Sequence, residues 1–175
     1  MATYYWIGGT GNFSDGTHWS LTSGGSAANA VPTYVDDVIF NSASSASSYV
    51  VTLTTAAFGY NWTLGAPSSG TLTIADGGNI AYVCNNLTIA AANVLSTQTG
   101  GWNITSTSVV ASPLTPSIQS STITTVTTNN NSNFASCPIT FNVGSNNLAQ
   151  LGSDMTMGAI IIKANQFATN SYNTV

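Results

Sequence analysis

The stretch NWTLGAPSSGTLTIADGGN, from Asn61 to Asn79, decides the fold class of this 175-residue chain. It holds two apolar–Thr–apolar triplets, WTL and LTI, separated by a Gly/Pro/Ser turn and followed by the turn signal ADGGN. Successive side chains of a strand point to opposite faces, so each triplet buries its two apolar residues and turns its Thr outward. The stretch therefore predicts short β-strands joined by turns.

Similar triplets recur along the chain, as VTL from Val51 and LTI from Leu87, with weaker echoes in the C-terminal half. From Leu72 to Leu87, and from Leu87 to Asn103, the spacing is roughly 15 residues, too short for helical repeats and too long for simple two-residue hairpins. It favours a β-solenoid, whose apolar side chains stack inward at roughly 4.8 Å, or two strands plus loops per repeat. A Greek-key β-sandwich is the alternative.

The composition independently indicates an all-β protein. Charged residues make up 3% of the chain, with a net charge of −4 and neither Arg nor Glu. Good helix formers are therefore scarce, whereas Thr, Val, Ile and Tyr suit strands. A hydrophobic content of 43% argues against disorder. The sequence contains no long apolar run of the kind that would predict a membrane-spanning helix.

Several classes of partner are disfavoured by the same composition. Lys163 is the only basic side chain, so we expect neither nucleic acid nor an anionic membrane as a partner. Cys84 and Cys137 lack metal-ligand spacing and predict buried thiols, with one long-range disulfide as the alternative. The N-terminus lacks the basic and apolar segments of a secretory signal peptide. We also expect no cofactor.

Few residues are candidates for chemistry. Asp36 and Asp37 are the only adjacent acids and a weak Ca²⁺ candidate; the alternative is a turn in which one carboxylate accepts backbone N–H groups. Asp15 and His18 could belong to a catalytic set, but we favour a polar loop in which His18 packs against Trp19. Glycosidase chemistry needs paired carboxylates, and the scattered aspartates lead us to expect no enzyme activity.

Aromatic residues later in the chain predict two different roles. Sugar faces pack on aromatic rings, which makes Tyr60 and Tyr82 candidates for glycan contact. Trp62 and Trp102 are expected in the core.

The segment YYWIGGTGNFSDGTHWS, Tyr4 to Ser20, and then VPTYVDDVIF, Val31 to Phe40, resemble the leader of a family of repetitive β-rich proteins. The family occurs in bacteriophage virions and bacterial surface adhesins. Its pattern is W-x-G-G-x-G-x-W/F-S-D-x-x-H/N-W-S followed by V-P-x-x-x-D-D-V-x-F. The resemblance implies an all-β fold, a right-handed parallel β-helix (solenoid) with an N-terminal cap of aromatic residues and glycines, and no enzymatic residues. Residues 1–41 would be the cap and attachment segment and 42–175 the repeats, with the cap formed by Trp6, Gly8, Gly9, Gly11, Trp19, Pro32 and Phe40.

The resemblance further implies a bacteriophage virion structural protein, in a tail fibre, tailspike or related appendage for host attachment. A capsid (head) decoration or cement protein is the alternative, and a bacterial surface adhesin fragment a further one. The expected partners are other virion proteins, a host surface glycan and further copies of the chain, with a trimer favoured. The expected location is the virion, assembled in the host cytoplasm, or else the cell surface. Because the chain stops within a repeat at Val175, we expect either part of a longer fibre or a complete decoration protein.

Overall fold

The computed structural model describes residues 1–76, 78–91, 93–97 and 100–104, without the Asp76 side chain, and the backbone of five later strands. Its elements are β1 (Thr3–Trp6), β2 (Gly11–Asn12), the 3-10 turn η1 (Gly16–His18), β3 (Trp19–Ser20), β4 (Asp37–Phe40), β5 (Tyr49–Leu53), β6 (Ala57–Gly59), β7 (Trp62–Leu64), β8 (Leu72–Asp76), β9 (Ala81–Val83), β10 (Leu87–Ile89), β11 (Val94–Ser96), β12 (Trp102–Ile104), β13 (Thr124–Thr127), β14 (Asn133–Phe141), β15 (Leu148–Leu151), β16 (Thr156–Ile162) and β17 (Gln166–Ala168). Within these ranges there is no α-helix, and no helix is long and apolar enough to cross a membrane.

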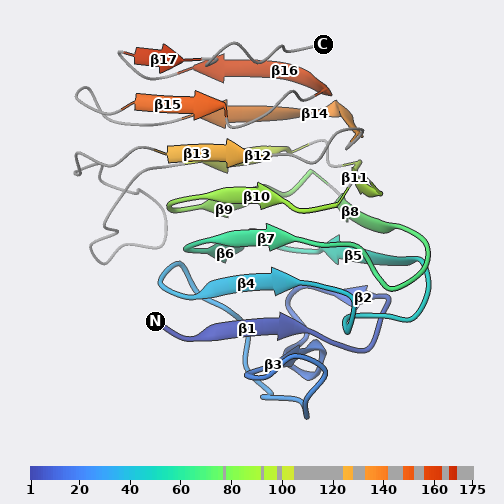
Figure 1. Ribbon diagram of the computed structural model, residues 1–175. Coiled ribbons are helices and arrows are strands. Elements are labelled where there is room, and N and C mark those ends of the chain that lie inside the picture. Colours follow the sequence, from blue (N-terminus) through green and yellow to red (C-terminus); the bar gives the residue numbers. More distant parts are fainter. Residues whose placement is uncertain are drawn as a thin grey trace.

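The strands form two sheets layered from β1 and β3 at one end to β16 and β17 at the other (Figure 1). The eight-stranded sheet has the order β17-β15-β13-β10-β7-β4-β1-β3, and the nine-stranded sheet has the order β2-β5-β8-β11-β14-β12-β9-β6, with β16 on β14. Only β1 and β3 pair in antiparallel fashion; the other described pairs are parallel. The predicted all-β class is confirmed. A Greek-key sandwich needs antiparallel neighbours, so that alternative is wrong for these strands.

The strands recur in groups of three. One strand of the eight-stranded sheet is followed by two strands of the nine-stranded sheet, as in β4-β5-β6, β7-β8-β9 and β10-β11-β12. In the first position Val38, Trp62 and Leu87 are aligned partners, and the β10 alignment continues to Val126 in β13. The first three groups therefore repeat after roughly 24 residues, a length common among stacked structural repeats.

The triplet spacing expected from the sequence is therefore wrong as a structural repeat. Leu72 lies in β8 and aligns with Tyr49 and Val94, whereas Leu87 lies in β10 of the other sheet and aligns with Trp62. Each group holds three short strands with the same alternation of buried and outward residues. Consecutive triplets consequently look alike although they belong to different sheets.

The alternation predicted for the triplets is confirmed by burial. In β7 the side chains of Trp62 and Leu64 are buried and Thr63 between them is only half-buried, and β9, β10 and β12 follow the same pattern. The inward residues form one continuous apolar core that runs from Trp6 to Ile104. Trp62 and Trp102 lie in this core, as expected, with ring centroids 5.2 Å apart.

One polar group in the core stands out. Tyr49 is 2% exposed, and its hydroxyl has no hydrogen-bond partner in the described part of the chain. Burial raises the pKa of Tyr49 to about 12. The nearby Ser44 hydroxyl lowers this pKa slightly, but it accepts the Asn41 N–H and makes no well-formed bond to Tyr49.

Candidate functional site

The leader packs its aromatic rings together at the N-terminal end of the sheets. Trp19 contacts Trp6, Phe13 and Phe40 edge-on, at centroid distances of 5.0, 4.9 and 5.7 Å. Phe13 stacks on Trp62 of β7 at 5.2 Å, which joins the leader to the strand groups. The predicted burial of Trp6 and Trp19 is confirmed, since both are 0% exposed.

Two indole N–H groups fix the backbone around these rings. Trp6 Nε1 donates to the Gly9 carbonyl at 2.7 Å, and Trp19 Nε1 donates to the Phe13 carbonyl at 2.8 Å. Gly8 and Gly9 adopt φ values of 81° and 76°, a left-handed conformation that favours glycine. The short strands β2 and β3 lie at the ends of the two sheets, so the leader borders both of them (Figure 1).

His18 is held by the leader, but against a different ring from the one expected. Its imidazole stacks on Trp6 at 4.7 Å with an interplanar angle of 6°, and its Nδ1 lies 2.9 Å from the Ile7 carbonyl oxygen. The expected packing against Trp19 is therefore wrong. Gly11 makes room for the imidazole, because a Cβ there would lie 2.3 Å from Nε2.

The Asp15 carboxylate bonds to Thr17, while the Asp15 backbone carbonyl accepts the His18 N–H at 3.1 Å. The carboxylate caps η1 by accepting the Thr17 hydroxyl at 2.7 Å and the Thr17 N–H at 2.9 Å. These two hydrogen bonds, the hydroxyl's first, hold the pKa of Asp15 below its ordinary value. The geometry favours the polar-loop interpretation over a catalytic set.

The two adjacent aspartates have separate structural partners. Asp36 Oδ1 accepts the Ala2 N–H at 2.7 Å, and Oδ2 accepts the Thr33 hydroxyl at 2.6 Å and the Thr33 N–H at 3.1 Å. Burial raises the pKa of Asp36, but the hydrogen bonds from Thr33 and Ala2 outweigh it and leave this pKa below its ordinary value. The predicted alternative, a turn with one carboxylate accepting backbone N–H groups, is confirmed. No cluster of three metal-ligating acids, histidines or cysteines occurs in the described ranges.

Asp37 begins a ladder of amides that the sequence did not reveal. Its Oδ1 accepts Asn61 Nδ2 at 2.8 Å, and Asn61 Oδ1 accepts Asn85 Nδ2 at 2.9 Å. Asp37 is the first residue of β4, and the two asparagines lie just before β7 and β10, so the ladder crosses three groups of strands. The ladder could have been identified only from the alignment of β4, β7 and β10, which the triplet spacing does not give.

The glycan candidates lie on outward positions. Tyr82 in β9 is half-buried and stacks on Phe58 of β6, with ring centroids 5.1 Å apart and planes at 11°. Tyr60 is half-buried at the corner between β6 and β7, where its N–H donates to the Asp36 carbonyl at 2.7 Å. Phe58 was missed because no outward partner was evident until β6 and β9 were aligned.

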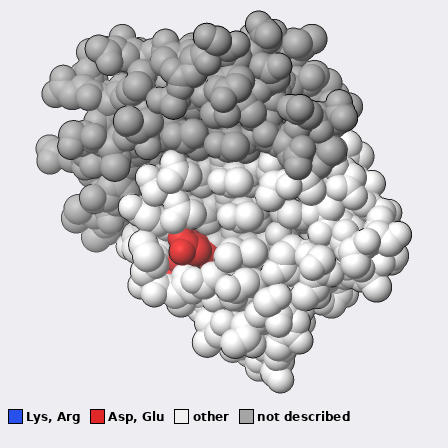
Figure 2. Space-filling view, in the orientation of Figure 1, with Lys and Arg blue, Asp and Glu red and all other residues white. Residues whose placement is uncertain are grey.

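The described surface carries very little charge. The face in Figure 2 has acidic atoms at one place and no basic side chain outside the grey region. Lys163 lies outside the described residues, as do the side chains of Asp76, Cys137 and Asp154. Cys84 is buried, as predicted, whereas the Cys137 side chain, its candidate disulfide partner, lies outside the described residues.

No family model, curated protein or solved structure matches this chain.

Proposed function

We propose that the chain is a right-handed parallel β-helix in which three strands form each turn and residues 1–41 cap one end. The proposal is supported by the parallel registers, which align Val38 with Trp62 and Leu87 in one position and Ala57 with Ala81 and Trp102 in another. Inward apolar residues that recur in register are what such a stack needs for a continuous core. The cap role is supported by the location of β2 and β3 at the sheet ends.

The function we propose is that of a non-enzymatic structural protein of a bacteriophage virion, in a tail fibre, tailspike or related appendage that attaches to the host. One observation carries this proposal: the leader residues that give the resemblance interlock as a single aromatic unit. Trp6, Trp19 and Phe40 are each 0% exposed. The residues that could take part in catalysis already have structural partners: Asp15 caps a 3-10 turn, His18 stacks on Trp6, and Asp36 holds a turn.

Assembly with other virion proteins and with copies of the chain belongs to this proposal. A surface with few charges has little repulsion to keep copies apart, and its hydroxyl and amide groups suit flat polar contacts. We expect a trimer whose sedimentation is the same at low and high salt, since screening has little charge to act on. A monomer in both conditions well above micromolar concentration would contradict self-assembly.

The test of the virion role is gold labelling of intact particles with an antibody raised against the chain. We expect label on the tail or its appendages. Label over the head would replace attachment with capsid decoration. Label on the bacterial surface in uninfected cells would instead identify an adhesin fragment, and particles without label would overturn the virion assignment.

A further inference from the structure

We propose that the stacked rings of Phe58 and Tyr82 form a binding platform for a neutral sugar ring at the open edge of the nine-stranded sheet. The inference rests on the proposed attachment function and gives it a ligand class. It extends the pair of tyrosines expected from sequence by adding Phe58 and by locating the contact on β6.

The two rings form one outward stack. Phe58 and Tyr82 are aligned partners of β6 and β9, and both are half-buried. Ala57 and Gly59, on either side of Phe58, are buried, so Phe58 points away from the core. With a centroid distance of 5.1 Å and an angle of 11°, one face of Phe58 is covered by Tyr82.

The other face of Phe58 lies at a sheet edge. β6 is the last strand in the order of its sheet, and Tyr82 is the only aromatic partner of Phe58 among the described residues. The neighbouring peptide groups bond to the β9 side, where the Ala57 N–H donates to Ile80 and the Gly59 carbonyl accepts from Cys84. By alternation, the Phe58 N–H and carbonyl face the open edge, where they can bond to hydroxyl groups.

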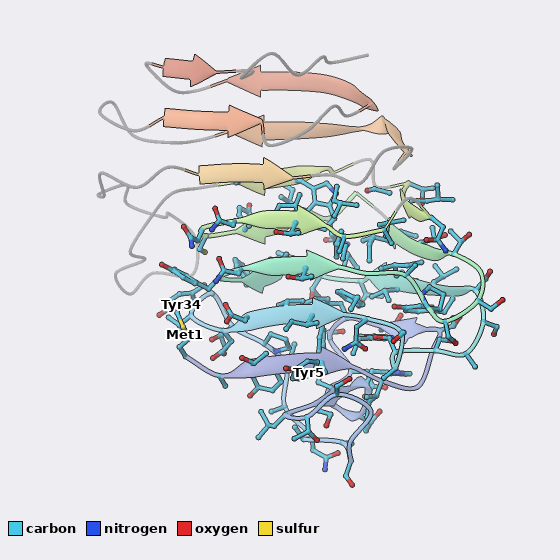
Figure 3. The ribbon with its side chains drawn as sticks, viewed as in Figure 1. Met1, Tyr5 and Tyr34 are labelled. Atoms are coloured by element: carbon cyan, nitrogen blue, oxygen red, sulfur yellow. The ribbon has the colours of Figure 1, made fainter. Side chains whose placement is uncertain are left out.

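The chemistry of the surroundings favours a neutral sugar. Pyranose rings present apolar C–H faces and hydroxyl edges, which match an aromatic ring beside peptide groups at an edge. No Lys or Arg side chain is present among the described residues to attract an acidic sugar, and the carboxylates of the nearby Asp36 and Asp37 repel one. Tyr60 follows β6 at the adjoining corner, where its N–H donates to Asp36 in the turn that also carries Tyr34; Tyr34 is labelled in Figure 3.

A second copy of the chain is a weaker occupant for this edge. β6 has three residues, and its edge is closed at Tyr60 by the bond to the Asp36 carbonyl. So short an edge offers too few backbone bonds for stable strand addition.

The experiment titrates the full chain with maltohexaose, mannohexaose, galactohexaose and chitohexaose, and with an acidic oligogalacturonate, while aromatic ¹H–¹³C resonances are followed by NMR. We expect shifts of Phe58 and Tyr82 with at least one neutral hexasaccharide and none with the oligogalacturonate. Phe58→Leu and Tyr82→Leu, which keep apolar volume but lose the flat ring, should each weaken binding about tenfold. The matched control is Tyr5→Leu, which removes an outward aromatic from β1 and should leave affinity unchanged.

Three results would overturn the inference. They are binding of none of the four neutral sugars, binding unaffected by both leucine variants, and self-association that Phe58→Leu abolishes, which would identify a second copy as the occupant. The wild-type shifts do not depend on how well a variant folds. If particles carry the label but these rings do not bind sugar, attachment stands and the inference fails. If the rings bind sugar but particles carry no label, the sugar platform stands and the virion assignment fails.

Discussion

Replacing Trp19 by alanine should destabilise the protein by about 3–5 kcal/mol, the range for removing a fully buried large aromatic side chain. The side chain is 0% exposed and meets Trp6, Phe13 and Phe40 edge-on at 5.0, 4.9 and 5.7 Å. These rings are held by separate strands and turns, so they cannot all collapse into the vacated space. We therefore expect the upper half of the range, measured as the shift in urea midpoint followed by circular dichroism.

Two further variants separate packing from hydrogen bonding at the same position. Trp19→Phe keeps an aromatic ring but leaves the Phe13 carbonyl without its indole donor, which should cost about 1–3 kcal/mol. Leu21→Ala, close by in sequence and 57% exposed, should stay within about 0.5 kcal/mol of the parent. If Trp19→Ala were no more destabilising than Leu21→Ala, the interlocked leader would not be what stabilises this end of the sheets.

Four other outcomes follow from the geometry. Gly11→Ala should destabilise by about 1–3 kcal/mol because its Cβ meets the imidazole, and a double-mutant cycle with His18→Ala should recover most of that loss. Asn61→Asp should lower stability by roughly 1–3 kcal/mol at pH 7 in urea titrations, because it sets a second carboxylate against the aspartate of the ladder. The folded-state pKa of Asp36 lies below its ordinary 3.8, so its contribution to stability is present above about pH 4 and disappears as pH falls through that folded pKa; Asp36→Asn should flatten this acid loss in urea titrations. Tyr49→Phe should be neutral or stabilise by up to about 1 kcal/mol in thermal melts, since it removes a buried hydroxyl without a partner.

The local part of the fold could be predicted because the strand period is local. In WTL at Trp62 and LTI at Leu87, the alternation of side chains alone fixes which residues are buried. The pairing of strands could not be predicted in the same way. LTI at Leu72 and LTI at Leu87 are identical triplets in different sheets, and only the backbone alignment between successive groups of three strands distinguishes them.

In the candidate site, too, the features that depend on local sequence could be predicted, and those that depend on strand pairing could not. Burial of Trp6 and Trp19 could be predicted, because large aromatic rings in a glycine-rich leader have few other places to go. The partner of His18 could not, since Trp19 is adjacent in sequence and Trp6 is brought close only when β1 pairs with β3. The Phe58–Tyr82 stack likewise depends on the register of β6 and β9.

The same register explains why this chain has so few charges. Parallel strands repeat equivalent positions at roughly 4.8 Å, so if the same charged residue recurred at one position, each charge would face another of the same sign in the next layer. At that distance two like charges repel by about 3 kcal/mol at an effective dielectric constant of about 20. An amide avoids this cost because it both donates and accepts, as Asn61 does between Asp37 and Asn85. Asp37 can only accept hydrogen bonds, and it occupies the first position of the ladder, where it accepts from Asn61 and has no further ladder residue to donate to. A parallel stack therefore disfavours like charges at successive equivalent positions and accommodates Thr, Asn and Ser there, in keeping with a charged fraction of 3%.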